Sequence, residues 1–500
     1  MAGQYPLLYQ LNTRIILGEL GRSIGRPATL DDLPDVFLDR IAARGFDWVW
    51  PLGVWQTGPA AREISRTRPS LRDGYGHDLP DWREEDVAGS PFAVQAYDVH
   101  RDYGGNTALA RLRDRLSRRR LKLLLDFVPN HVAPDHAWVR ERPEFFIEGT
   151  DEDLAREPQN WGRFAAGRGA RVLAFGRDPY FPGWPDAVQL NYRHAGLREA
   201  MLGELGRVSE RCDGVRCDMA MLVQPQIFLR TWGERAMPRD GSQPHDEPFW
   251  SDAIARIKRK RPEFTFIAEV YWDMEWELQQ AGFDFTYDKR LYDRLVARQA
   301  GPVRDHLRAA PDFQDRSLRF LENHDEPRAA ATFQPPEMHM AAATITYFVP
   351  GLRFFHEGQL EGRKARASMH LGRRVVEEPD AQLTAFYDRL LAVQRRPEVH
   401  EGKWRELFAR AAWDGNPTVD RFVAGLWESG DKRVLTVVNF GDTQAQCYLP
   451  VDVPEMKGRK VVLVDLLGEA RYERDGATLL SEGLYLDLPP WGMHVFELRI

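Results

Sequence analysis

The chain has 500 residues, of which 43% are hydrophobic and 29% charged, and its formal net charge is −7. This length is too great for one small core and predicts two or three domains of a soluble globular protein. The net negative charge gives no indication of a nucleic-acid partner, and no apolar stretch reaches the roughly 18 residues of a membrane-spanning helix.

The cysteines and the first residues bear on the cellular compartment. Cys212, Cys217 and Cys447 are odd in number and have no metal-ligand spacing. They predict no disulfide framework, which fits a reducing compartment. Residues 1–12 contain no basic region followed by an apolar run, so no secretory signal is expected. We therefore expect a cytoplasmic protein with no membrane partner.

Apolar strands alternate with helical patterns along the first 400 residues. Continuous apolar strands separated by helices indicate a parallel sheet that is covered on both faces. Strands are expected at residues 5–10, 46–50, 121–127, 214–218, 264–269, 283–287, 318–323 and 352–355. Helices are expected at residues 32–44, 109–120, 197–211, 251–260, 276–281, 291–309, 338–348 and 383–394. Eight such repeats predict a closed (β/α)8 TIM barrel, with an open doubly wound sheet as the alternative.

Three other segments depart from this alternation. Residues 51–106 are rich in Gly, Pro and Arg and are expected to form a long loop. Residues 133–192 show little periodicity and are too long for a loop, so they predict a subdomain inserted after strand 3. Short β-rich runs at 434–439, 461–465, 484–488 and 494–498 predict a C-terminal all-β sandwich domain. The expected boundaries are 1–132 and 193–400 for the barrel, 133–192 for the insert, and 401–500 for the last domain.

The end of the fourth predicted strand carries two charges, Arg216 and Asp218. Side chains alternate along a strand, so these two residues share one face. Burying both charges is costly unless they contact each other. A guanidinium keeps its charge and favours an ionised carboxylate beside it, which suits Asp218 as a nucleophile. Taken alone, this stretch is explained equally well by a structural ion pair.

Polar residues also end the third, fifth and seventh strands. Catalysis in this type of barrel takes place where the carboxyl ends of the strands meet. Each unpaired buried charge costs of the order of several kcal/mol, so a rim with this many polar groups indicates a functional site. The polar residues at these strand ends are Asp126, Asn130, His131, Arg216, Asp218, Glu269, Asn323, His324 and Asp325.

These residue types fit the cleavage of a glycosidic bond, in which one carboxylate attacks the anomeric carbon and a second carboxyl group protonates the leaving oxygen. Asp218 is the ionised candidate. Glu269 lies between apolar residues, which raise a carboxyl pKa and suit a general acid. Asp325 is left to bind sugar hydroxyls and to favour the cationic transition state. His131 and His324 can donate hydrogen bonds to hydroxyls beside it.

In this order and spacing, the motifs resemble those of the alpha-amylase family (glycoside hydrolase family 13), over nearly the whole chain. The resemblance implies that Asp218 is the nucleophile, Glu269 the acid/base and Asp325 the transition-state stabiliser. It also implies a sugar subsite lined by Tyr97, His131, Arg216 and His324. The motifs are Ala96-Tyr97-Asp98-Val99, Asp126-x-x-x-Asn130-His131, Gln189-Leu190-Asn191, Gly214-x-Arg216-x-Asp218, Ala268-Glu269-Val270 and Phe320-Leu321-Glu322-Asn323-His324-Asp325.

Several positions depart from the family pattern. Many members have a Lys-His pair after the nucleophile strand, where this chain has Met221-Leu222. The usual Gly-Gln-Glu after strand eight is Gly358-Gln359-Leu360 here. Asn130 resembles a calcium ligand, but the insert offers no clear set of the about six to eight oxygen ligands that calcium needs. We therefore expect no metal and no cofactor.

The resemblance also suggests the shape of the site. In the family's α-glucosidases and sucrose-acting members, an aspartate at the place of Asp98 binds the outermost sugar, often with an arginine from the loop after strand eight. Arg363 is the first candidate for this arginine and Arg366 the second. Such a pair would close the cleft into a pocket for chain ends or small sugars. The alternative is that Asp98 is a solvated loop carboxylate.

Three functions are compatible with the sequence. The leading hypothesis is a retaining hydrolase of α-glucosidic bonds in α-glucans or small α-glucosides. A transglycosylase, isomerase or phosphorylase acting on sucrose, trehalose or maltose would use the same residues, so the motifs do not separate it from a hydrolase. The third is a non-catalytic barrel that serves as a binding subunit. The presence of all three carboxylates makes this third function the least favoured. A carbohydrate is the expected partner, and the sequence indicates no oligomeric state.

Overall fold

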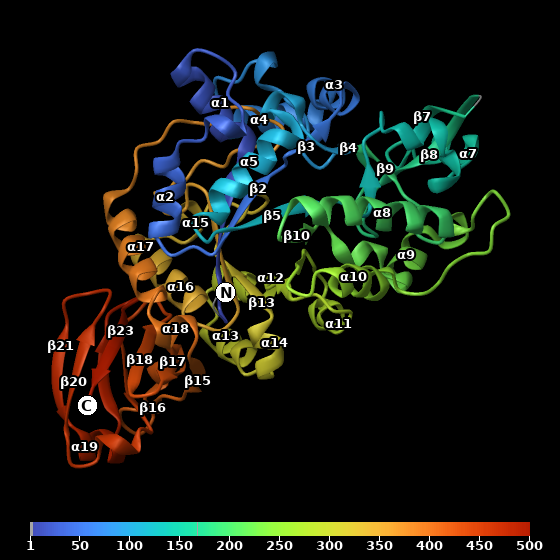
Figure 1. The fold of residues 1–500 in the computed structure, drawn as a ribbon. Coiled ribbons are helices and arrows are strands. Elements are labelled where there is room, and N and C mark those ends of the chain that lie inside the picture. Colours follow the sequence, from blue (N-terminus) through green and yellow to red (C-terminus); the bar gives the residue numbers. More distant parts are fainter. Residues whose placement is uncertain (1–3, 168) are drawn as a thin grey trace.

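The chain folds around a closed barrel of eight parallel strands (Figure 1). The computed structural model describes residues 4–167 and 169–500. Each barrel strand pairs in parallel with the strands on both sides. The predicted fold class is therefore confirmed. Around the barrel the strands are β1 (Leu7–Asn12), β2 (Trp48–Leu52), β5 (Lys122–Phe127), β10 (Gly214–Cys217), β11 (Thr265–Ala268), β12 (Phe285–Tyr287), β13 (Ser317–Phe320) and β14 (Leu352–His356).

Helices lie on the outside of the barrel, between its strands and after the last one, and the amphipathic ones bury one apolar face. In α5, for example, the buried residues Ala108, Leu109, Leu112 and Leu116 recur three or four positions apart, as an amphipathic helix requires. The connecting helices are α2 (Asp35–Ala43), α5 (Gly105–Ser117), α8 (Ala195–Arg211), α9 (Pro225–Trp232), α10 (Phe249–Lys260), α11 (Glu275–Gln280), α12 (Lys289–Val296), α13 (Ala300–Leu307), α14 (Pro311–Asp315), α15 (Ala329–Thr332), α16 (Pro336–Tyr347), α17 (Ala381–Gln394) and α18 (Pro397–His400).

Some helices differ from those expected. The helix predicted over 291–309 is divided into α12 and α13, and Arg298 between them has left-handed backbone (φ 58°). Helix α1 (Thr13–Ile24) was not predicted. The segment expected as a loop contains α3 (Pro59–Thr67), α4 (Pro69–Asp78) and the paired strands β3 (Trp55–Thr57) and β4 (Val94–Val99). Proline is the first residue of both α3 and α4, where its missing N–H has no helical partner to lose.

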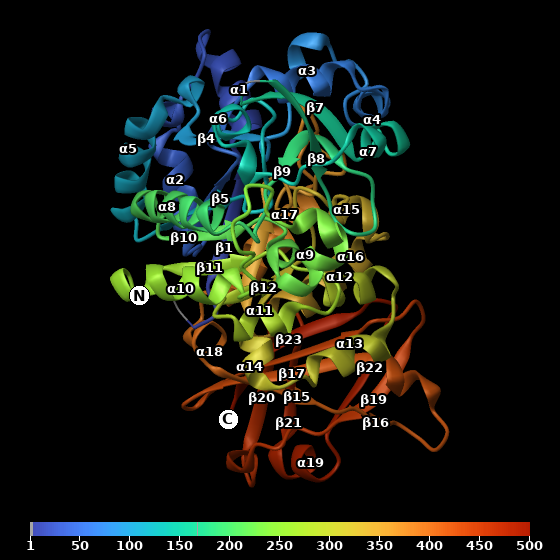
Figure 2. The ribbon, with the colours of Figure 1, turned by 90° about the vertical axis from the view of Figure 1, so that its right-hand side faces the viewer.

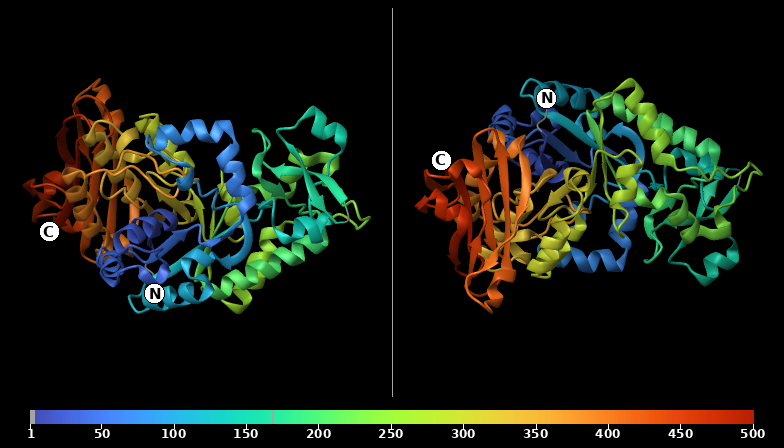
Figure 3. Two further views of the ribbon diagram at one scale, coloured as in Figure 1. Left: turned by 90° about the horizontal axis from the view of Figure 1, so that it is seen from above. Right: turned by 90° about the horizontal axis from the view of Figure 1, so that it is seen from below.

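The insert between β5 and α8 is built on a four-stranded antiparallel sheet in the order β6, β9, β8, β7 (Figure 2). Helix α3 packs against β9, so the long segment of residues 51–106 contacts the insert. Viewed from above, α3 lies between the barrel and the insert (Figure 3, left). The insert contains β6 (His131–Val132), α6 (Ala137–Glu141), α7 (Asp151–Arg156), β7 (Trp161–Ala166), β8 (Gly169–Gly176) and β9 (Trp184–Gln189).

The C-terminal region is all-β apart from one short helix, as predicted, and has its own apolar core. Its sheets have the orders β15-β17-β18-β23-β20-β21 and β16-β19-β22. The indole Nε1 of Trp427 donates to the carbonyl oxygen of Phe348 in the barrel domain at 2.9 Å. The elements are β15 (Lys403–Leu407), β16 (Arg410–Ala411), β17 (Phe422–Ser429), β18 (Lys432–Asn439), β19 (Ala445–Leu449), β20 (Lys460–Asp465), β21 (Arg471–Asp475), α19 (Gly476–Ser481), β22 (Leu484–Leu488) and β23 (Met493–Arg499). Among the described residues, no helix is both long and apolar enough to cross a membrane.

Candidate active site

The barrel brings two of the predicted carboxylates to adjacent positions. In the parallel pairing of β10 with β11, Cys217 lies beside Ala268. Asp218 and Glu269 are the next residues of their strands, so both emerge at the same level of the rim. Asp325 follows β13 by five residues and lines the same cavity as the other two. The three carboxylates that the motifs indicated therefore surround one space.

Arg216 connects the first two carboxylates. Its Nη1 donates to Asp218 Oδ1 at 2.5 Å, and its Nη2 lies 2.7 Å from Glu269 Oε2. The arginine side chain is almost fully buried, at 1% exposure. The rings of Trp50, Phe92 and Tyr287 lie 5.3 to 5.6 Å from the guanidinium carbon, within the range of cation–π attraction. Because water is excluded, the fixed positive charge acts strongly on both carboxyl groups.

Glu269 has two further hydrogen-bond partners. The backbone N–H of Met219 donates to Oε2 at 2.7 Å, and the Tyr271 hydroxyl donates to Oε1 at 2.8 Å. Burial raises the pKa of Glu269 to about 8, and the charges of Asp218 and Asp325 add to this rise while Arg216 opposes it. A carboxyl group with this pKa is protonated at neutral pH, as a general acid must be.

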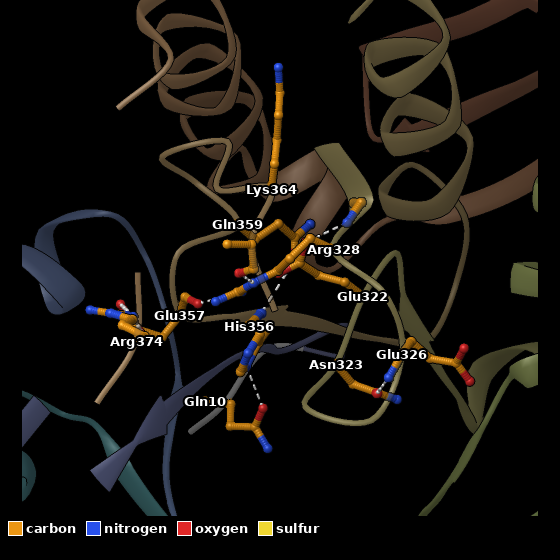
Figure 4. A network of polar contacts seen from close by, with 12 residues as sticks. Gln10, Glu322, Asn323, Glu326, Arg328, His356, Glu357, Gln359, Lys364 and Arg374 are labelled. Carbon is orange, nitrogen blue, oxygen red and sulfur yellow. Dashed lines mark hydrogen bonds and ion pairs between the residues drawn. The ribbon is translucent and has the colours of Figure 1, made fainter. Parts of the chain in front are cut away.

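Asp325 is oriented by a chain of polar contacts that begins at the first strand. His356 Nδ1 contacts Gln10 Oε1 at 2.7 Å (Figure 4). Gln10 Nε2 in turn contacts His324 Nδ1 at 3.0 Å. Since an amide oxygen only accepts and an amide nitrogen only donates, His324 accepts at Nδ1 and carries its proton on Nε2. That nitrogen lies 3.1 Å from Asp325 Oδ2. Burial and the nearby Arg216 hold the pKa of His324 well below its usual range, so the ring is neutral.

The cavity has a volume of about 520 Å³. The side chain of Asp325 is 47% exposed. Burial of its surroundings still raises the pKa of Asp325, and the positive charges of Arg216 and Arg366 oppose this rise. His131 also lines the cavity, and burial lowers its pKa so that it is neutral. The remaining walls are formed by Arg68, Leu71, Ser90, Phe92, Ala93, Pro182, Gly183, Trp184, Pro185, Asp186, Ala187, Met219, Tyr271 and His370.

Of the four residues expected to line the sugar subsite, His131 lines the cavity, whereas Arg216, His324 and Tyr97 are not among its lining residues. Tyr97, predicted to line the sugar subsite, is not part of the cavity wall. Its hydroxyl donates to the Val128 carbonyl oxygen and accepts from the Val128 N–H, both at 2.9 Å. Phe92 takes the place at the cavity, with its ring 5.5 Å from that of His324 and tilted by 31°. The sequence signal that could have found Phe92 is an aromatic residue closely preceding the Tyr97 motif.

The predicted pair between Asp98 and Arg363 is wrong. Asp98 alternates with buried Tyr97 on β4 and therefore points outward. It accepts from Asn106 Nδ2 at 2.9 Å and pairs with Arg211 at 3.2 Å, and 65% of its side chain is exposed. Neither Asp98 nor Arg363 lines the cavity. The second candidate, Arg366, contacts the carbonyl oxygen of Asp325 at 3.2 Å and the carboxylate of Asp78 at 3.4 Å.

Two other polar residues at the end of β5 have partners within the protein. Asp126 accepts from Trp50 Nε1 at 3.1 Å and from the Gly53 N–H at 2.8 Å. The side-chain oxygen of Asn130 accepts from Gln189 Nε2 at 2.9 Å. Both residues therefore hold the rim together. Within residues 4–167 and 169–500, no group of three or more His, Cys, Asp or Glu side chains is arranged to hold a metal ion.

Comparison with known proteins gives the family. A model described as "Alpha amylase, catalytic domain" matches residues 92–382, more than half of the chain. The chain belongs to the alpha-amylase family. The resemblance inferred from the motifs is thus confirmed, and the matched model is that of a catalytic domain, as predicted for an enzyme of this family.

Individual alpha-amylase family proteins are distant in sequence. The chain is 24% identical to alpha-amylase MalA of Haloarcula japonica over 455 residues, which cover 89% of this chain and 56% of that protein. It is 22% identical to an alpha-glucosidase of Candida albicans over 380 residues, 66% of this chain and 61% of that one. The solved structure of the noncanonic maltogenic alpha-amylase AmyB from Thermotoga neapolitana matches with a TM-score of 0.71 at 19% identity and covers both chains completely. This last similarity shows the fold.

Proposed function

We propose that the protein is a retaining glycosidase that cleaves α-glucosidic bonds. The observation that carries this proposal is the position of Arg216 between Asp218 and Glu269, at 2.5 and 2.7 Å. One fixed positive charge beside two carboxyl groups allows one of them to stay ionised while the other keeps its proton. A pair of carboxyl groups in opposite protonation states is what glycoside cleavage requires.

The first step transfers the sugar to the protein. Glu269 gives its proton to the glycosidic oxygen while an oxygen of Asp218 bonds to the anomeric carbon, and the bond to the leaving group breaks. The raised pKa of Glu269 supports its assignment as the acid. Asp325, whose Oδ2 lies 3.1 Å from His324 Nε2, lines the same cavity, where a carboxylate stabilises the positive charge that develops on the sugar ring.

The second step releases the sugar. Glu269, now ionised, takes a proton from a water molecule, the water oxygen bonds to the anomeric carbon, and the ester bond to Asp218 breaks. Two displacements at one carbon restore the α configuration. This mechanism requires the Asp218 and Glu269 carboxyl groups to lie about 5–5.5 Å apart, whereas inverting enzymes separate theirs by roughly 6.5–9.5 Å.

The size of the site favours a small substrate or the end of a chain. Cavities of about 300–1,000 Å³ typically enclose one ligand of a few rings, and this cavity measures about 520 Å³. Arg68 and Leu71 of the α3–α4 segment contribute to its wall together with the insert residues Trp184 and Asp186. This part of the wall, and not an Asp98–arginine pair, would limit the length of the bound sugar.

Proton NMR of the first product tests the proposal. With an α-linked disaccharide as substrate, the new reducing sugar should appear as the α anomer before mutarotation. Asp218→Asn should show no turnover with unchanged thermal unfolding. A β anomer as first product would contradict the double displacement.

Cytoplasmic location is also part of the proposal. The three buried, unpaired cysteines support it, and cell fractionation tests it.

A further inference from the structure

The backbone is left-handed directly after Asp218 and again three residues after Glu269. Met219, which follows Asp218, has φ of 43°, and Trp272 and Asp273 have φ of 65° and 62°. Among the described residues, these are three of the six non-glycine residues with positive φ. Left-handed backbone costs about 1–3 kcal/mol at such residues and persists where the surrounding structure requires it. Two of them in succession form the turn that carries Trp272.

Trp272 meets an aromatic residue from the insert. Its ring centroid lies 5.0 Å from that of Tyr180, at an interplanar angle of 74°, so the two rings form a corner. The guanidinium of Arg230 lies 5.0 Å from the Tyr180 ring. Asp178 Oδ1 accepts from the Tyr180 N–H at 2.6 Å and from the Phe181 N–H at 3.0 Å, which fixes the loop. We call Tyr180 and Trp272 the aromatic corner.

Both residues of the aromatic corner are close in sequence to residues that line the cavity. Trp272 directly follows Tyr271, which lines the cavity and donates to Glu269. Tyr180 comes two residues before Pro182, another residue of the cavity wall. Yet Tyr180 is 52% exposed. An exposed aromatic ring offers a sugar an apolar face with a polar group at its edge. Because the acid protonates the leaving oxygen, the side of Glu269 is the side of the leaving group.

The two positions after the nucleophile strand at which many family members have a Lys-His pair are apolar and inaccessible here. Met221 and Leu222 are buried, at 0% and 3% exposure, so they offer neither a hydrogen bond nor an open surface to a sugar. A sugar on this side must find its contacts elsewhere. The apolar C–H face of a pyranose ring packs well on an aromatic face, and the hydroxyl of Tyr180 adds one polar group.

We propose that the aromatic corner binds the sugar on the leaving-group side of the cleaved bond, which rests on the proposed glycosidase function. The same surface then receives a sugar acceptor in the second step. There an acceptor hydroxyl oxygen bonds to the anomeric carbon, Glu269 takes the hydroxyl proton, and the ester bond to Asp218 breaks. The aromatic corner therefore favours transfer to sugars over transfer to water when the sugar concentration is high.

The test compares a substrate with a leaving-group sugar to one without. Tyr180→Ala and Trp272→Gly are assayed with maltose and with α-glucosyl fluoride, whose fluoride leaving group makes no contact with the corner. Glycine accepts the left-handed backbone of position 272. Each variant should lower kcat/KM for maltose by roughly three- to tenfold, the worth of one aromatic contact. Turnover of the fluoride should stay within about twofold of wild type, and the yield of oligosaccharide products at high maltose should fall.

Two matched variants complete the design. Tyr180→Phe keeps the ring and should behave nearly as wild type. Trp413→Ala removes a tryptophan of the C-terminal domain that is 54% exposed, and the kinetics with both substrates should stay unchanged. Unchanged kcat/KM for maltose in Tyr180→Ala, or an equal loss for both substrates, would overturn the inference; unchanged kinetics would also be the result for a surface that binds another protein.

The experiments distinguish a failure of the proposed glycosidase function from a failure of the proposed sugar binding by the aromatic corner. If the wild-type protein cleaves neither substrate, the glycosidase proposal fails. Calorimetry of maltotriose binding to wild type and to Tyr180→Ala then tests whether the aromatic corner binds sugar, independently of catalysis. Several-fold weaker binding by the variant supports it, and equal binding or no binding by the wild type overturns it.

Discussion

The backbone N–H of Met219 donates a 2.7 Å hydrogen bond to the Glu269 carboxyl group. Met219 directly follows Asp218, so the strand that carries the proposed nucleophile also positions the proposed acid. The left-handed backbone of Met219 (φ 43°) turns this N–H toward the neighbouring strand. Together with the contacts of Arg216 to both carboxyl groups, this couples the positions of the two residues.

Glu269→Gln should slow the cleavage of poor leaving groups far more than that of activated ones. A general acid contributes about 10²- to 10⁴-fold to the rate when the leaving oxygen needs a proton. Maltose should therefore lose a factor in this range, and the first step with α-glucosyl fluoride should change little. Pre-steady-state fluoride release measures that step. Equal losses with both substrates would show that Glu269 is not the acid.

Activity should decline as the pH rises through about 8. Glu269 is protonated below its pKa of about 8 and loses the proton above it, so kcat/KM for maltose should fall on the alkaline side. The profile of kcat/KM against pH, measured from pH 5 to 10, checks this. Glu269→Gln has no proton to lose at this position, and its residual activity should lack that limb. A wild-type profile that stays flat to pH 10 would contradict the assignment.

Glu269 should also make folding stability depend on pH. Its folded-state pKa of about 8 lies above the ordinary value of 4.5, so the folded protein binds the proton more tightly than the unfolded chain. This contribution is complete below pH 4.5 and is lost as the pH rises toward 8, at about 1.4 kcal/mol per pKa unit. The free energy of unfolding of Glu269→Gln, relative to wild type, should therefore increase between pH 5 and 8.5 in urea titrations. A constant difference would contradict the raised pKa.

Phe92 and Tyr97 should respond differently to substitution. Phe92→Ala removes a cavity wall that covers Arg216 and His324, so kcat/KM should fall at least tenfold, with the larger part in kcat. Tyr97→Phe removes both hydrogen bonds to Val128, which should cost about 1–3 kcal/mol of stability and leave kcat/KM within about twofold. Kinetics and urea unfolding of both variants check this. A kinetic defect confined to Tyr97→Phe would restore the role that the motif suggested.

The positions of the carboxylates could be predicted because topology determines them. In a parallel barrel the carboxyl ends of all strands meet at one rim, so Asp218 and Glu269 had to meet once their strands were identified. Phe92 could not be placed in this way. It lies in a segment between α4 and β4 whose path depends on contacts with distant residues, and no local pattern specifies which aromatic residue will reach the cavity.

The helices within residues 51–106 could not be predicted from the sequence for a related reason. Helix α4 contains Gly74 and Gly76 and begins with Pro69, so its composition is that of a loop. It is supported by packing of Tyr75 with Leu79 at its C-terminal end and with Val87 and Leu371, which lie outside the helix. The aromatic corner likewise joins two loops that are more than ninety residues apart in sequence, so only the folded chain reveals it.

The central claim is that Asp218 forms a covalent bond to the sugar and that Glu269 is needed to release it. Peptide-mapping mass spectrometry of Glu269→Gln after incubation with α-glucosyl fluoride tests this most directly. Fluoride leaves without an acid, but the second step lacks its base, so a glucosyl ester should accumulate. The account predicts one added glucosyl unit on the peptide containing Asp218 and none in the Asp218→Asn, Glu269→Gln double variant. A glucosyl unit on another residue, or release of β-glucose without any adduct, would contradict it.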